Sequence, residues 1–135
     1  MNGRSIGAVI GGIVVGIIVM FLFNIVVDKL YPPDFEAIKA LGNNPQKIAQ
    51  YLRDMPAGFH LMGIIGGLLR LIAGLLVGSI IDKQNLMTPI VIAAFFLLLA
   101  VLDSFAFPHP TWYGLVYITA IIVASIGFVY MKRRA

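Results

Sequence analysis

The chain has 135 residues, of which 60% are hydrophobic and only 12% are charged. Its mean hydropathy is strongly positive, which excludes an ordinary water-soluble domain. The absence of cysteine excludes disulfides, thiolate metal sites and cysteine nucleophiles. The formal charge of +4 comes from basic residues scattered between apolar runs, a distribution that fits membrane flanks better than a nucleic-acid surface. We therefore expect the lipid bilayer, and no nucleic acid, as a partner.

Four apolar segments are long enough to cross a membrane. A spanning helix needs roughly 20 apolar residues, because a rise of about 1.5 Å per residue must cross about 30 Å of hydrocarbon. Backbone polar groups find no water there, so helices are the expected form. The segments are about residues 5–27, 58–81, 87–107 and 112–131. The predicted fold class is an all-α membrane protein with four transmembrane helices in an antiparallel bundle, forming a single domain over residues 1–135.

The first segment is predicted to stay attached as a membrane anchor. Its apolar run is too long for a secretory signal, and no small-x-small cleavage site precedes Asp28.

An even number of spans puts both termini on one side of the membrane. Basic residues are nearly balanced between the two sides, but Lys132, Arg133 and Arg134 cluster where the last segment ends, and no Lys or Arg lies between Asp103 and Trp112. This pattern predicts that the N- and C-termini lie in the cytoplasm.

The loop of residues 28–57 contains signals for two short interfacial helices. Pro33 or Asp34 can open the first, and Gly42 can close it in a left-handed conformation. Asn44 is typical of an N-cap, with Pro45 as the first residue of a second helix that ends before Pro56. Its predicted apolar face consists of Ile48, Tyr51, Leu52 and Met55, and its polar face of Gln46, Gln50 and Arg53. Such a helix lies on the bilayer or caps the bundle, or it offers a docking surface to a partner.

Small residues recur at helical spacing in three of the segments. The second segment carries Gly63, Gly67, Gly74 and Gly78 within about 60° of one another on the helical wheel. The first carries Ala8, Gly12 and Gly16, and a second stripe of Gly7 and Gly11. The fourth carries Ala120, Ala124 and Gly127 aligned with Tyr113 and Tyr117. Small residues let membrane helices approach closely, so we expect internal packing, with an oligomeric or partner-binding face as the alternative.

Arg70 lies near the middle of the second segment, at one edge of its glycine stripe. An arginine at the bilayer centre costs about 2.5–3.5 kcal/mol and normally faces the bundle interior with a partner. The nearest candidate is Asp103, which in an antiparallel pair lies about 7.5 Å closer to the outside. Side chains lean toward the N-terminus of their own helix, which points these two toward each other. We predict a buried pair that is either structural or one wall of an outward-facing polar cavity, with an Arg70 directed toward a partner subunit as the alternative.

Two histidines are predicted at the outer side of the membrane. His60 begins the second segment, and His109 lies in FPHPTWYG between the third and fourth. Asn24, Asp28 and Ser104 belong to the same side, so a polar site is possible there, although neither histidine has the spacing that defines a metal or haem site. We expect no cofactor and no metal, and we expect Trp112, Tyr113 and Tyr117 to form an aromatic belt at the membrane surface.

The order of these features resembles that of small uncharacterised four-helix inner-membrane proteins of bacteria. The resemblance is carried by a glycine-studded first span, PPDFEAIKAL, FHLMGIIGGLLRLIAGLLVGSII and FPHPTWYG. It covers most of the chain and implies the four-helix fold. It implies no activity, and it assigns no functional residue.

Three functional hypotheses follow from the sequence. The leading one is a non-catalytic accessory or structural subunit that packs against other membrane proteins, or against itself, through glycine-lined faces and the first-loop helices. The second is a small transporter or channel component that uses Arg70 and Asp103, and the third is a cofactor-binding electron-transfer subunit that uses His60 and His109. The sequence contains no phosphate-binding loop, no Gly-x-Ser-x-Gly elbow and no His-Glu-x-x-His motif. We therefore expect that the protein is not an enzyme.

Overall fold

The computed structural model describes residues 2–134, which form six helices and, over those residues, no strand. The helices are α1 (Gly3–Leu30), α2 (Phe35–Ala40), α3 (Pro45–Arg53), α4 (Ala57–Ile81), α5 (Met87–Ala106) and α6 (Thr111–Arg134). Helices α1, α4, α5 and α6 are long and apolar enough to cross a membrane. They match the four predicted segments to within a few residues, so the predicted all-α, four-span fold is confirmed.

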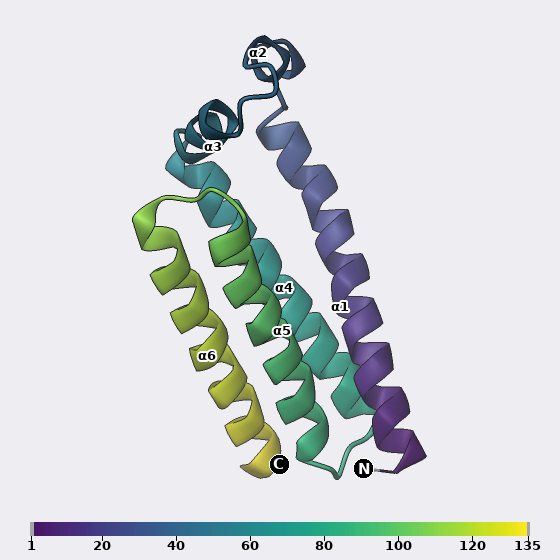
Figure 1. Ribbon diagram of the computed structural model, residues 1–135. Helices are drawn as coiled ribbons and strands as arrows, with labels where there is room; N and C mark the ends of the chain where they lie inside the picture. The colour runs from purple at the N-terminus through teal and green to yellow at the C-terminus, as the bar shows by residue number, and fades with distance from the viewer. Residues whose placement is uncertain (1, 135) are drawn as a thin grey trace.

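The four long helices run antiparallel, with α4 and α5 between α1 and α6 (Figure 1). Helix α4 packs against α1, α5 and α6. Both chain ends lie at one end of the bundle, called here the terminal end, and α2, α3 and the α5–α6 connection lie at the other, called the loop end (Figure 1). Large apolar side chains such as Phe21, Phe105 and Leu115 point outward from the bundle. This outer surface suits lipid, and the protein is an integral membrane protein.

Glycines bring α1 and α4 into backbone contact. A Cβ atom at Gly12 would lie 2.5 Å from the carbonyl oxygen of Gly74, and one at Gly16 would lie 2.5 Å from the carbonyl oxygen of Arg70. Both distances are shorter than carbon and oxygen atoms tolerate without bonding, so no larger residue fits without moving one helix. Gly7, in the second stripe of the first segment, has nothing within 4 Å of a Cβ position. Gly11 of the same stripe meets the end of the Ile81 side chain, 3.3 Å from a Cβ position. The stripe containing Gly12 and Gly16 is therefore the one through which the backbones of α1 and α4 meet.

A hydrogen-bond network closes the terminal end. The Asp82 carboxylate, just after α4, accepts from Ser5 of α1 and, at 2.9 Å, from Thr88 of α5. Lys132 of α6 donates to the backbone oxygens of Asp82 and Asn85 at 2.9 and 3.2 Å. The hydrogen bond from Ser5 is the main cause that lowers the pKa of Asp82. All four long helices are thus connected at one end by hydrogen bonds that the sequence analysis did not predict.

The two short helices of the first loop form as predicted. Asp34 caps α2, and Gly42 follows it with φ at +63°. The Asn44 side chain accepts from the backbone nitrogens of residues 46 and 47, and Pro45 occupies the first turn of α3. The predicted apolar face of α3 is half-buried and its polar face is exposed. Helix α3 therefore lies across the loop end of the bundle with its apolar side inward.

Candidate functional site

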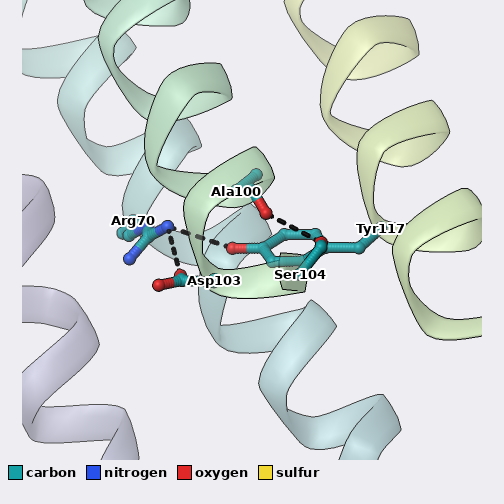
Figure 2. A network of polar contacts seen from close by, with 5 residues as sticks. All are labelled: Arg70, Ala100, Asp103, Ser104 and Tyr117. Carbon is teal, nitrogen blue, oxygen red and sulfur yellow. Dashed lines mark hydrogen bonds and ion pairs between the residues drawn. The ribbon is translucent and has the colours of Figure 1, made fainter. Parts of the chain in front are cut away.

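Arg70 of α4 points into the bundle toward Asp103 of α5 and Tyr117 of α6 (Figure 2). Its Nη2 atom donates to Asp103 Oδ2 at 3.1 Å and to the Tyr117 hydroxyl at 3.1 Å. The side chain is 9% exposed, and its guanidinium lies 5.7 Å from the centre of the Phe96 ring. The ion pair expected from the depth of the two residues is present, and with the Tyr117 hydroxyl it joins three of the four long helices.

The pair leaves hydrogen-bonding groups unused. A guanidinium has five N–H donors, and both hydrogen bonds of Arg70 come from Nη2, while Nε has no partner within residues 2–134. Asp103 receives Arg70 on Oδ2 alone, and its side chain is 32% exposed. If the pair served only to hold helices together, it would be more stable in lipid with every donor and acceptor hydrogen-bonded. Here donors of Arg70 and one carboxylate oxygen of Asp103 lack a partner among residues 2–134.

A cavity of about 370 Å³ reaches this pair from the loop end. Its polar wall is formed by Arg70, Asp103, Asn24 and His109. Its apolar wall includes Met20 of α1, Leu52 of α3, Phe59 of α4, and Phe107 with Tyr113 beside the α5–α6 connection. The cavity thus has charged groups at its inner end and aromatic side chains nearer the outside, which is the usual composition of a small-molecule site.

His60 and His109 meet beside this cavity. Their Nδ1 atoms are 3.2 Å apart, and the His109 ring stacks on Tyr113 with 3.7 Å between ring centres. Since a neutral imidazole has one donor and one acceptor nitrogen, one histidine donates to the other. A smaller cavity of about 190 Å³, lined also by Asn24 and Asp28, adjoins both rings. Over the described part of the chain, no group of three or more His, Cys, Asp or Glu side chains is placed to hold a metal ion.

The pKa of His109 is lowered, chiefly by burial and further by the neighbouring His60, while Asp103 acts in the opposite direction. The groups facing His109 are His60 from α4, Asp103 from α5 and Tyr113 from α6, with Asp28 of α1 across the smaller cavity. The folded state therefore favours neutral His109 more than the unfolded state does. This contribution to stability is complete above the unfolded pKa of 6.5 and is lost as the pH falls through the lower folded value.

We expect the melting temperature of the wild-type protein in lipid nanodiscs to fall between about pH 7.5 and about pH 5.5 as protons bind. The His109→Gln variant should show a smaller fall, because glutamine does not titrate. Thermal unfolding followed by circular dichroism at several pH values measures both slopes. Equal slopes in the two proteins would contradict a neutral His60–His109 pair.

The structure corrects two expectations about the fourth segment. Tyr113 and Tyr117, expected in an aromatic belt at the membrane surface, are 3% and 1% exposed, and they pack on Gly63 and Gly67 of α4. The two tyrosines are four residues apart and align with small residues of the same helix. This pattern indicates that they lie on the face of α6 that packs inside the bundle. Gly127, expected in a packing stripe, has nothing within 4 Å of a Cβ position.

The glycines of α4 also face more than one helix. Gly63 and Gly67 receive the Tyr113 and Tyr117 hydroxyls of α6, whereas Gly74 meets α1 and Gly78 meets Ile92 of α5. The glycine at position 67 therefore makes room for the tyrosine that also binds Arg70. The predicted packing groove of α4 is thus occupied by three helices, α6 at Gly63 and Gly67 and both α1 and α5 at Gly74 and Gly78.

Comparisons with protein-family models, with curated proteins and with solved structures give no match for this chain.

Proposed function

We propose that the protein binds a polar solute in the cavity at Arg70 and Asp103, as a small transporter or channel component. The observation that carries this proposal is a cavity of about 370 Å³ that reaches a charged pair deep in the bundle. The Asp103 carboxylate of this pair is one-third exposed and accepts from Arg70 through Oδ2 alone. Charged residues inside membrane helices mark solute and ion pathways more often than they mark simple packing. These features favour a binding role over a purely structural one.

The proposed orientation places the loop end outside the cytoplasm. The basic cluster of residues 132–134 lies at the terminal end, and the connection of residues 107–110 at the loop end has no Lys or Arg. Cytoplasmic ends carry the excess of basic residues in bacterial inner membranes. On this proposal the cavity opens toward the periplasm, and the solute reaches Arg70 from that side.

Cysteine labelling tests whether the cavity holds water. The chain has no native cysteine, so a single introduced thiol reports without background. Met20 lines the cavity ten residues before Leu30, about 15 Å deep, whereas its neighbour Phe21 is 68% exposed on the outer surface. A charged methanethiosulfonate requires a thiolate, which forms in water and not in lipid. In nanodiscs we expect Met20→Cys to react at least about tenfold faster than Phe21→Cys.

The same variant tests binding. Small carboxylates, amines and zwitterions are added to Met20→Cys in turn, and the labelling rate is measured against concentration. We expect at least one class to slow labelling saturably. Equal rates for Met20→Cys and Phe21→Cys, or no protection by any class, would contradict a solute-binding function.

A second candidate, the non-catalytic accessory subunit, keeps one specific observation in its favour. Gly3 and Gly7, one turn apart on α1, have nothing within 4 Å of their Cβ positions, and small residues at this spacing are typical of contacts between membrane helices. Stoichiometric partners after purification in mild detergent would support it. The electron-transfer hypothesis has no comparable observation in its favour.

A further inference from the structure

We propose that the cavity at Arg70 and Asp103 takes a zwitterion, a molecule or headgroup in which an acidic group and an ammonium are close neighbours. This inference rests on the proposed function and specifies its ligand class. The two charges that reach the cavity have opposite sign, and their nearest atoms are 3.1 Å apart. A zwitterion carries both complementary charges in one molecule and so matches both residues.

The unused capacity of the pair fits this ligand. Arg70 spends Nη2 on Asp103 and Tyr117, and among residues 2–134 its Nη1 atom makes no hydrogen bond, so Nη1 can donate to an acidic group in the cavity that Arg70 lines. Asp103 accepts Arg70 through Oδ2, which leaves Oδ1 for an ammonium. A simple anion at the same place would meet the Asp103 carboxylate, and a simple cation would meet the guanidinium. Each would be disfavoured by like charge in surroundings that screen poorly.

The aromatic wall supports the same assignment. Phe59, Phe107 and Tyr113 line the cavity, and aromatic faces attract ammonium groups while also covering apolar carbon. The volume of about 370 Å³ lies at the small end of the range for ligand pockets. An amino acid with an apolar side chain fits this description, and so does the headgroup of an aminophospholipid entering from the bilayer.

Three ligands with the same branched alkyl chain test whether both charges are required. Leucine carries both charges, 4-methylpentanoate keeps only the carboxylate, and 3-methylbutylamine keeps only the ammonium. The dissociation constant of each is measured by protection of Met20→Cys from labelling, in nanodiscs of phosphatidylglycerol. Each analogue lacks one of the two charged groups of leucine and so loses the hydrogen bonds of that group. We therefore expect leucine to bind at least about tenfold tighter than either analogue.

A lipid arm separates the two sources of the zwitterion. Nanodiscs with a rising fraction of phosphatidylethanolamine should protect Met20→Cys without added leucine if a headgroup occupies the cavity. Protection by leucine in phosphatidylglycerol alone identifies a free solute. Either result supports the zwitterion. The zwitterion proposal is overturned if 4-methylpentanoate or 3-methylbutylamine binds as tightly as leucine and phosphatidylethanolamine has no effect. That result would leave solute binding intact. If no ligand or lipid protects Met20→Cys, the proposed function is overturned as well.

Substitutions of the pair should change which charge is preferred. Asp103→Asn leaves the guanidinium unopposed, so 4-methylpentanoate should become at least as tight a ligand as leucine. Arg70→Gln should shift the preference toward 3-methylbutylamine. Ser104→Ala, next to Asp103, is the control and should keep the wild-type order, since among residues 2–134 the Ser104 hydroxyl donates to the Ala100 carbonyl oxygen and not to the charged pair. If a single variant does not fold, the neutral double variant should bind all three ligands equally weakly. An unchanged leucine preference in any folded variant of the pair overturns the proposal.

Discussion

Replacing Gly12 with alanine is expected to destabilise the protein, although alanine is the better helix former. The added Cβ atom would lie 2.5 Å from the carbonyl oxygen of Gly74 and 2.8 Å from the Ile92 side chain. A backbone oxygen inside a helix cannot move aside by itself, so α1 and α4 must separate. Overpacking of this kind costs about 1–3 kcal/mol. The free energy of unfolding in mixed detergent or bicelles measures the effect.

Gly7 provides the matched control on the same helix. A Cβ atom there has nothing within 4 Å, so Gly7→Ala should leave the free energy of unfolding unchanged or raise it by up to about 1 kcal/mol through helix propensity. A similar loss in both variants would mean that α1 and α4 do not meet through the stripe of Gly12 and Gly16. The position of α1 matters beyond stability, because Met20 and Asn24 of this helix form one wall of the cavity.

The positions and types of the main elements were predictable because they follow from local physics. The length and hydropathy of an apolar run suffice to identify a membrane helix, and Asn44 followed by Pro45 suffices to start α3. The contact between Arg70 and Asp103 was also within reach, since the short turn between α4 and α5 fixes the relative depth of residues on the two helices. The depth of a residue in the membrane can be predicted from the helical rise and the position of the turn alone.

The neighbours of each helix were not predictable in the same way. A helical wheel gives the direction of Gly67 but does not say that α6, and specifically Tyr117, fills that direction. The bond between Ser5 and Asp82 joins residues 77 positions apart, and no local pattern marks it. The contact between His60 and His109 depends on the path of the α5–α6 connection, and the periodicity of apolar residues does not predict that path. These contacts depend on which helices pack side by side, and the sequence pattern does not determine that.

Neutralising one partner of the Arg70–Asp103 pair is the second large effect we expect. Asp103→Asn leaves a guanidinium that is 9% exposed with only the Tyr117 hydroxyl as a strong partner. Loss of one partner of a buried pair costs about 3 kcal/mol, mostly because the remaining charge is uncompensated. Arg70→Gln should cost less, because the Asp103 side chain is 32% exposed and water can reach it through the cavity.

The double variant should recover part of this loss. With both charges removed, no unpaired charge remains inside the bundle, and glutamine and asparagine keep most of the volume of the original side chains. We expect the combined cost to be smaller than the sum of the single costs by about 1–3 kcal/mol. Ser104→Ala combined with Arg70→Gln is the control, and its two costs should add, because the structure gives no direct hydrogen bond between these residues.

The measurement that tests this account most directly is the double-mutant cycle of Arg70→Gln and Asp103→Asn, by reversible unfolding in bicelles. A coupling of more than about 1 kcal/mol is predicted if the mid-membrane guanidinium is held by Asp103 inside the bundle. Additivity to within about 0.5 kcal/mol would contradict it. In that case the arginine would be stabilised by something other than Asp103, and the cavity would lose the charged pair on which its proposed role depends.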